Sequence, residues 1–160
     1  MNEGRYTWRH DSILKTIANS LSSVLGNQKI YYDWELQTFK SPCIITGDTC
    51  RPDLVIEVSS RSLIILELTV GYETNLEKNY LRKKEKYKRL IDELKIKYGS
   101  INYVNLSMGS IGTVFEKSKT SEKISQELGI EENNYNYLMK KIVEICIRCS
   151  YYIFCMRSKV

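Results

Sequence analysis

The stretch that decides the fold is "RPDLVIEVSSRSLIILELTV", residues 51–70. Its two runs of mainly apolar, β-branched residues are separated by three polar residues, which is typical of a hairpin of buried strands. Asp53 opens the first strand and Glu67 lies near the end of the second. Because side chains alternate along a strand, pairing across this hairpin allows the two carboxylates to converge on one point.

Two carboxylates in this arrangement are suited to Mg²⁺, which prefers hard oxygen ligands. The alternative is that Asp53 is an ordinary strand-entry residue and Glu67 a carboxylate at a sheet edge. Glu67 argues against that alternative, because a charge inside an apolar run is costly unless it is paired or bound to a metal. We therefore expect Asp53 and Glu67 to be metal ligands.

Metal sites that act on phosphodiesters usually include a lysine, yet the residue two positions after Glu67 is Thr69. The helix expected next supplies a lysine instead. Steps of four and three along it give an apolar and aromatic stripe interrupted only by Lys83: Leu76, Tyr80, Lys83, Tyr87, Leu90 and Leu94. A lysine on a buried stripe needs a carboxylate or a ligand within reach, so we expect Lys83 to face Glu67.

The rest of the chain shows no repeat or linker and predicts a single domain over residues 1–160 with the order α-β-β-β-α-β-α-α. A capping box at Thr74 and Glu77 is expected to start the long helix. The other expected elements are a helix at 12–25, a strand at 29–39, an irregular loop at 43–50, a strand at 101–108 and helices at 114–128 and 134–157.

Composition and charge narrow the class of protein. The 160 residues are 42% hydrophobic and 27% charged, as in ordinary globular proteins. No secretory signal or bilayer-long apolar run is visible, which favours an intracellular protein without a membrane partner. Residues 77–97 hold nine basic and four acidic side chains, and this excess of positive charge equals the net charge of the whole chain, +5. This excess indicates either a polyanionic partner or a solvated helix face.

The five cysteines are an odd number and are too scattered for a disulfide framework, so reduced thiols are expected. Cys146 and Cys149 have the spacing of a half zinc site, but no two further ligands match them. We expect no zinc and interpret this pair as small buried residues of a helix.

Four further segments extend the pattern around Asp53 and Glu67, which are separated by thirteen residues. Together they resemble the restriction-endonuclease-like PD-(D/E)xK superfamily, and more narrowly the endonuclease domain that follows the reverse transcriptase in site-specific non-LTR retrotransposons, or a stand-alone relative. The segments are "YTWRHDSIL" (6–14), "ELTVGYETN" (67–75), "RKKEKY" (82–87) and "CSYYIFCMR" (149–157). The resemblance implies an α/β fold with a restriction-endonuclease-like core, a mixed central β-sheet flanked by helices, and additional C-terminal helices.

The resemblance also implies Mg²⁺-dependent cleavage of duplex or branched DNA, with Mn²⁺ able to substitute and the lysine moved from the strand to the following helix. Asp53 and Glu67 would hold the metal, and Lys83 would orient the attacking water or stabilise charge on the phosphate. Lys86 is the alternative lysine. Secondary positions are Glu73, Thr69 and Tyr87, and the expected DNA-binding residues are Arg9, His10, Arg51, Lys84 and Lys88.

The sequence leaves several alternatives open. The chain is either an active nuclease or a nucleic-acid-binding domain that keeps the fold without turnover. A homodimer through the aromatic residues of the last helix is a third idea, although aromatics at helical spacing are usually core residues. The preferred location is the nucleus. The target DNA, and whether the chain is a fragment of a retroelement protein or a stand-alone product, are not determined.

Overall fold

The computed structural model describes residues 3–26, 29–32, 40–47 and 49–157. The order of elements agrees with the prediction except that one turn of helix, α2, replaces the loop expected at 43–50. The elements are α1 (Glu3–Leu25), β1 (Lys29–Tyr32), α2 (Cys43–Thr46), β2 (Leu54–Ser59), β3 (Ser62–Gly71), the 3₁₀ turn η1 (Glu73–Asn75), α3 (Leu76–Tyr98), β4 (Ser100–Gly109), the 3₁₀ turn η2 (Glu116–Lys119), α4 (Thr120–Glu127) and α5 (Glu132–Arg157).

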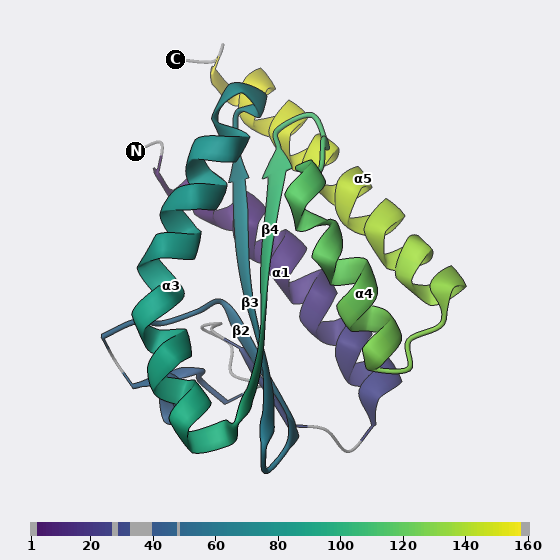
Figure 1. Ribbon diagram of the computed structural model, residues 1–160. Helices are drawn as coiled ribbons and strands as arrows, with labels where there is room; N and C mark the ends of the chain where they lie inside the picture. The colour runs from purple at the N-terminus through teal and green to yellow at the C-terminus, as the bar shows by residue number, and fades with distance from the viewer. Residues whose placement is uncertain (1–2, 27–28, 33–39, 48, 158–160) are drawn as a thin grey trace.

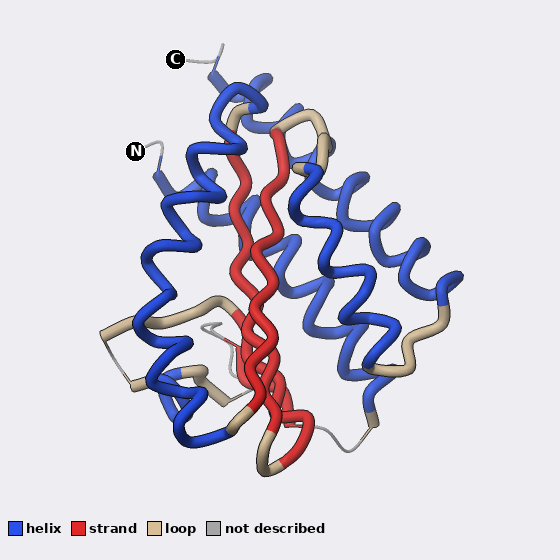
Figure 2. The backbone as a smooth tube through the Cα atoms, viewed as in Figure 1, coloured by secondary structure: helices blue, strands red, loops and turns tan. Residues whose placement is uncertain are grey.

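The four strands form one mixed sheet in the order β1-β2-β3-β4 (Figure 2). The β2–β3 hairpin is antiparallel, as is β1 with β2. β4 pairs with β3 in parallel, so the chain must cross from the end of β3 back to its start, and α3 makes that crossover. The mixed sheet flanked by helices, with α4 and α5 following β4, confirms the α/β class and the additional C-terminal helices that were expected.

Helices cover both faces of the sheet (Figure 1). Alternate residues of β3 point to opposite faces, so one strand contributes to two cores. Ile64, Leu66 and Leu68 belong to the larger core, with α1 and α5. Leu63 and Ile65 belong to the smaller core, against α3.

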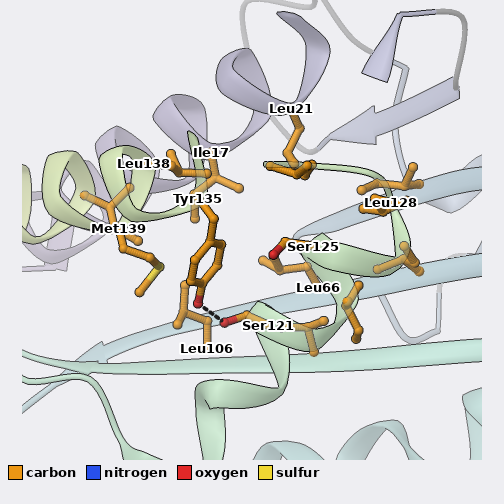
Figure 3. Close-up of a pocket in the computed structure, with 16 residues that line it drawn as sticks. Ile17, Leu21, Leu66, Leu106, Ser121, Ser125, Leu128, Tyr135, Leu138 and Met139 are labelled. Atoms are coloured by element: carbon orange, nitrogen blue, oxygen red, sulfur yellow. Dashed lines mark hydrogen bonds between the residues drawn. The ribbon is translucent and has the colours of Figure 1, made fainter. Parts of the chain in front are cut away.

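The larger core contains a small cavity of about 70 Å³ between α1, the sheet, α4 and α5 (Figure 3). Its lining is aliphatic apart from Ser121, Ser125 and Tyr135. The hydroxyls of Ser121 and Tyr135 bond each other at 2.8 Å, and Ser125 donates to the Glu122 carbonyl at 2.7 Å. The cavity is therefore an apolar gap whose polar rim is satisfied by the protein itself.

α1 begins at Glu3, whereas the sequence predicted a start at Ser12. The extra turns are held by α5: Arg9 donates to Ser150 at 2.9 Å, and the rings of Trp8 and Tyr152 are 5.6 Å apart. This tertiary packing extends the helix beyond the amphipathic stripe from which the start was predicted.

The capping box predicted at Thr74 and Glu77 is wrong. α3 begins at Leu76, and Asn75 is its N-cap without a side-chain cap bond. Thr74 lies in η1 instead. The carboxylate of Glu73 accepts from the Ile111 amide at 2.8 Å and ties this turn to the loop after β4.

One other boundary differs from the prediction, and one is not tested. The strand expected at 29–39 is present as β1 over Lys29–Tyr32, and the rest of that range, residues 33–39, lies outside the described part of the chain. The helix expected at 114–128 starts later because Val114 still bridges Met108 in a β-like arrangement. Cys146 and Cys149 are buried in α5, as predicted for small core residues. No helix in the described ranges combines the length and the apolar character needed to cross a bilayer.

Candidate active site

The site lies where β3 loses one of its two neighbours. β2 starts at Leu54, which pairs with Leu66, while β3 continues to Gly71 and, among the described residues, pairs there with β4 alone. The β2-side edge of β3 is therefore open from Leu68 onward. Asp53 stands at that opening: its carboxylate accepts from the Leu68 amide at 2.8 Å, so a side chain takes over the pairing that β2 no longer provides.

Glu67 is on the α3 face and is only 1% exposed. One of its oxygens accepts from the ammonium of Lys83, and the other accepts from the Asp53 amide at 3.3 Å. The structure thus brings Asp53, Glu67 and Lys83 together from two strands and a helix, which is the arrangement expected from the hairpin and from the helical stripe.

The ionised form of Glu67 is disfavoured by its surroundings in this position. Burial and the nearby charge of Asp53 raise the pKa of Glu67, while Lys83 acts in the opposite direction. Two tyrosines close the α3 side. Burial, reinforced by the charge of Glu67, raises the pKa of both Tyr87 and Tyr103, so their hydroxyls stay protonated. Tyr87 donates to the Arg51 carbonyl at 2.8 Å.

His10 reaches the same point from α1. Its Nε2 lies 3.3 Å from Asp53 Oδ2 and 3.2 Å from the Leu68 carbonyl oxygen, and its Nδ1 lies 3.0 Å from Asp11. Burial disfavours the charged ring, but the hydrogen bonds and charges of Asp53 and Asp11 outweigh burial and raise the pKa of His10 to about 9. At neutral pH the ring is an imidazolium beside the carboxylate.

The alternative lysine is placed differently. Lys86 is exposed, and its ammonium lies 3.2 Å from the Tyr87 hydroxyl and over the Tyr87 ring. Thr69 shares a face with Glu67, and in the described part of the chain its buried hydroxyl has no hydrogen-bond partner. The geometry therefore favours Lys83 over Lys86 as the lysine of this site.

The remaining expected residues lie outside this cluster. The carboxylate of Glu73 accepts hydrogen bonds from the Ser110 hydroxyl and the Ile111 amide. Arg9, expected to bind DNA from the surface, is only 5% exposed. The other expected DNA contacts, Arg51, Lys84 and Lys88, are exposed.

The sequence did not lead us to expect the buried polar side chains next to Glu67 on the neighbouring strand β4. Asn105 and Ser107 on β4 are buried and stand beside Glu67 and Thr69 in the parallel register. Ser107 donates to Asn105 at 3.2 Å, and Asn105 donates to the Tyr80 carbonyl at 2.9 Å. The signal was present in "YVNLSM" (103–108), where polar side chains on one face alternate with apolar side chains on the other.

The donor set suits a hard cation. Within the described ranges no group of three or more His, Cys, Asp or Glu side chains is placed to hold a metal ion. Mg²⁺ needs fewer protein ligands, since it is usually bound by one or two carboxylates together with water and substrate phosphate. Asp53 and Glu67 are neighbouring carboxylates of that kind, and the Leu68 carbonyl oxygen lies near the Asp53 carboxylate, since both are within 3.3 Å of His10 Nε2.

No protein-family model and no curated protein matches the sequence. Among solved structures, the chain is similar to the cap-snatching endonuclease of Toscana virus, with a TM-score of 0.47 and 16% sequence identity. The similarity covers 92% of this chain and 68% of that chain.

Proposed function

We propose that this chain is a metal-dependent endonuclease that hydrolyses DNA phosphodiester bonds, with Mg²⁺ as cofactor and Mn²⁺ as a substitute. The observation that carries the proposal is the meeting of Asp53, Glu67 and Lys83 at the open edge of β3. Burial and Asp53 both disfavour the charge of Glu67, so this pair of carboxylates is costly to the fold, whereas phosphodiester hydrolysis on a metal uses both carboxylates and the lysine.

The roles of the residues follow from their contacts. Asp53 and Glu67 would hold the metal, which when bound supplies Lewis-acid polarisation of the scissile phosphate. Lys83 keeps its ammonium at Glu67 and presents the remaining donors to the phosphate oxygens, where negative charge develops during hydrolysis.

His10 acts on Asp53. Its imidazolium and the Leu68 amide both bond the same oxygen, Asp53 Oδ2, and so fix the orientation of the carboxylate. The ring nitrogen also faces the Leu68 carbonyl. If a metal ion replaced the proton on Nε2, the ring would become a nitrogen donor beside these oxygen donors.

The partner and origin complete the proposal. The exposed Lys84 and Lys88 of the basic helix α3, with Arg51 beside the site, are the groups proposed to follow a DNA backbone. A retroelement origin and a nuclear location are proposed from the segments that resemble retrotransposon endonucleases.

The test is metal-dependent nicking of supercoiled plasmid. Asp53→Asn keeps the size of the side chain and removes its charge, and it is expected to lower the rate at least about a thousandfold, since a metal contributes several kcal/mol to such a step. Glu57→Gln is the matched control, because Glu57 is a carboxylate of β2 that pairs with Lys29 at 3.4 Å instead of the site. A folded wild-type protein that cleaves no DNA with Mg²⁺ or Mn²⁺ contradicts the proposal.

A second function, DNA binding without turnover, has one observation in its favour. Lys83 and the imidazolium of His10 already compensate the two carboxylates without a metal. Under this alternative, salt-dependent DNA binding persists in Asp53→Asn, and calorimetric titration of the wild type with Mg²⁺ or Ca²⁺ shows no binding heat.

A further inference from the structure

A groove of about 360 Å³ lies beside the site, between α1, the junction of β3 and η1 at Tyr72, the loop after β4 and the second half of α5. We call it the aromatic–arginine groove after six of its lining residues. These are Tyr6, Arg9, Tyr72, Tyr151, Phe154 and Arg157. It is separate from the apolar core cavity of Figure 3, since the two share no lining residue.

Arg9 is the first reason to expect a ligand there. Its side chain is only 5% exposed, yet no carboxylate of the described residues lies within ion-pair distance of it. Its guanidinium donates to two neutral acceptors, Ser150 at 2.9 Å and the Val70 carbonyl at 3.5 Å, and its Nε has no partner. Glu73 attracts it only through space. A buried cation that no described carboxylate contacts is costly, so the groove favours an anion.

The exposed rings are the second reason. Tyr72, Tyr151 and Phe154 are 55%, 68% and 71% exposed, which is unusual for large aromatic side chains. Arg157 lies over the Tyr6 ring and donates to the Tyr6 and Tyr72 hydroxyls. Aromatic faces set between guanidinium groups match a nucleotide strand, whose bases stack on rings while its phosphates meet arginines.

The groove is continuous with the site. His10 and Arg9 are consecutive residues of α1, and they donate to the carbonyls of Leu68 and Val70 on the same open edge of β3. These carbonyls are two residues apart, or about 6.6 Å along a strand. A DNA strand whose scissile phosphate lies at Asp53 would therefore pass along this edge of β3 into the groove.

We propose that the aromatic–arginine groove binds unpaired nucleotides of the DNA strand next to the scissile phosphate, with bases on Tyr72, Tyr151 and Phe154 and phosphate on Arg9 and Arg157. The identity of the strand rests on the proposed function. Because bases in a continuous duplex are already stacked and paired, the groove selects single-stranded or branched DNA.

The test is fluorescence anisotropy with a short labelled single-stranded oligodeoxynucleotide in EDTA, where no cleavage occurs. Tyr151→Ala is expected to weaken binding roughly 5- to 150-fold, the range for loss of one stacked base. Tyr137→Ala is the matched control, since Tyr137 is also on α5 and is 69% exposed but lies outside the groove. The affinity of Tyr137→Ala is expected to match that of the wild type. Both variants are expected to have the thermal stability of the wild type.

An abasic oligonucleotide of the same length separates stacking from charge. The wild type should bind it more weakly than Tyr151→Ala binds the unmodified strand, because all three stacking contacts are lost instead of one. Tyr151→Ala should bind the abasic strand about as weakly as the wild type does. Arg157→Gln should lower the salt dependence of binding by about one phosphate contact, a slope change of roughly 0.7.

The proposal fails if Tyr151→Ala binds like Tyr137→Ala, or if single strands bind no better than duplex. It also fails if sedimentation shows that Tyr151→Ala breaks a dimer, because a second copy would then occupy the groove. Nicking that depends on Asp53 while Tyr151 has no effect on binding would leave the nuclease proposal standing. Binding that depends on Tyr151 without any nicking would support the groove and contradict the nuclease proposal.

Discussion

The two halves of β3 differ in their partners and in their chemistry. Residues 62–66 are paired on both sides, with β2 and with β4. Within the part of the chain that the structure describes, residues 67–71 are paired with β4 alone. The first half contributes four consecutive buried apolar side chains after Ser62, and the second half carries Glu67 and Thr69.

The difference shows why the polar groups gather at one place. Each strand residue presents an amide and a carbonyl that need partners, and on the open edge of the second half no strand supplies them. Asp53, His10 and Arg9 bond the groups that are left. One strand is thus a core element at its start and a platform for charged side chains at its end.

The largest effect is expected in the doubly paired half. Ile65 is fully buried against α3, so Ile65→Ala should lower the free energy of unfolding by about 2–5 kcal/mol through lost burial and a cavity. Urea denaturation measures this loss. Ile96→Ala is the control, because Ile96 on α3 is 89% exposed and its truncation should cost no more than about 0.5 kcal/mol. Similar losses in both variants would contradict the assignment of Ile65 to the core.

The singly paired half should instead respond in activity. Lys83→Met is expected to slow DNA nicking by about 10²–10³-fold, the effect of removing one group that stabilises developing charge. Lys86→Met, three residues further along α3, should slow it only a few-fold, because Lys86 contacts Tyr87 and not Glu67. Kinetics in excess enzyme compare the two rates. The opposite ranking would assign the catalytic role to Lys86.

The same two halves explain what could be predicted from the sequence. The hairpin of 51–70 and the inward-facing Lys83 follow from local periodicity, since strands repeat every two residues and helices every 3.6. The contact of His10 with Asp53 spans 43 positions and depends on how α1 packs against the open end of β3, just before β2 starts. No local pattern contains that packing. The start of α1 was missed for the same reason, because α5 holds its first turns.

The pH dependence of stability gives the next largest effect. The pKa of His10 rises from 6.5 in the unfolded chain to about 9 in the fold. Its stabilising charge is therefore fully present below pH 6.5 and is lost as the pH rises from 6.5 through about 9. The loss should be at most about 3 kcal/mol in metal-free protein. Urea midpoints at several pH values in EDTA measure it, and His10→Gln should remove this slope. A wild-type profile that is flat between pH 6.5 and 9 would show that Asp53 does not hold the charged ring.

The smallest effect separates two buried hydroxyls that stand side by side on β3 and β4. Thr69 has no hydrogen-bond partner within the described ranges, whereas Ser107 donates to Asn105 at 3.2 Å. Thr69→Val keeps the shape of the side chain and removes an unsatisfied hydroxyl, so it should raise the free energy of unfolding by about 1 kcal/mol. Ser107→Ala removes a bonded hydroxyl and should lower it by about 1 kcal/mol. Denaturation of both variants gives the signs. Equal losses would mean that Thr69 is bonded as Ser107 is, and that the open half of β3 carries no unsatisfied group at this position.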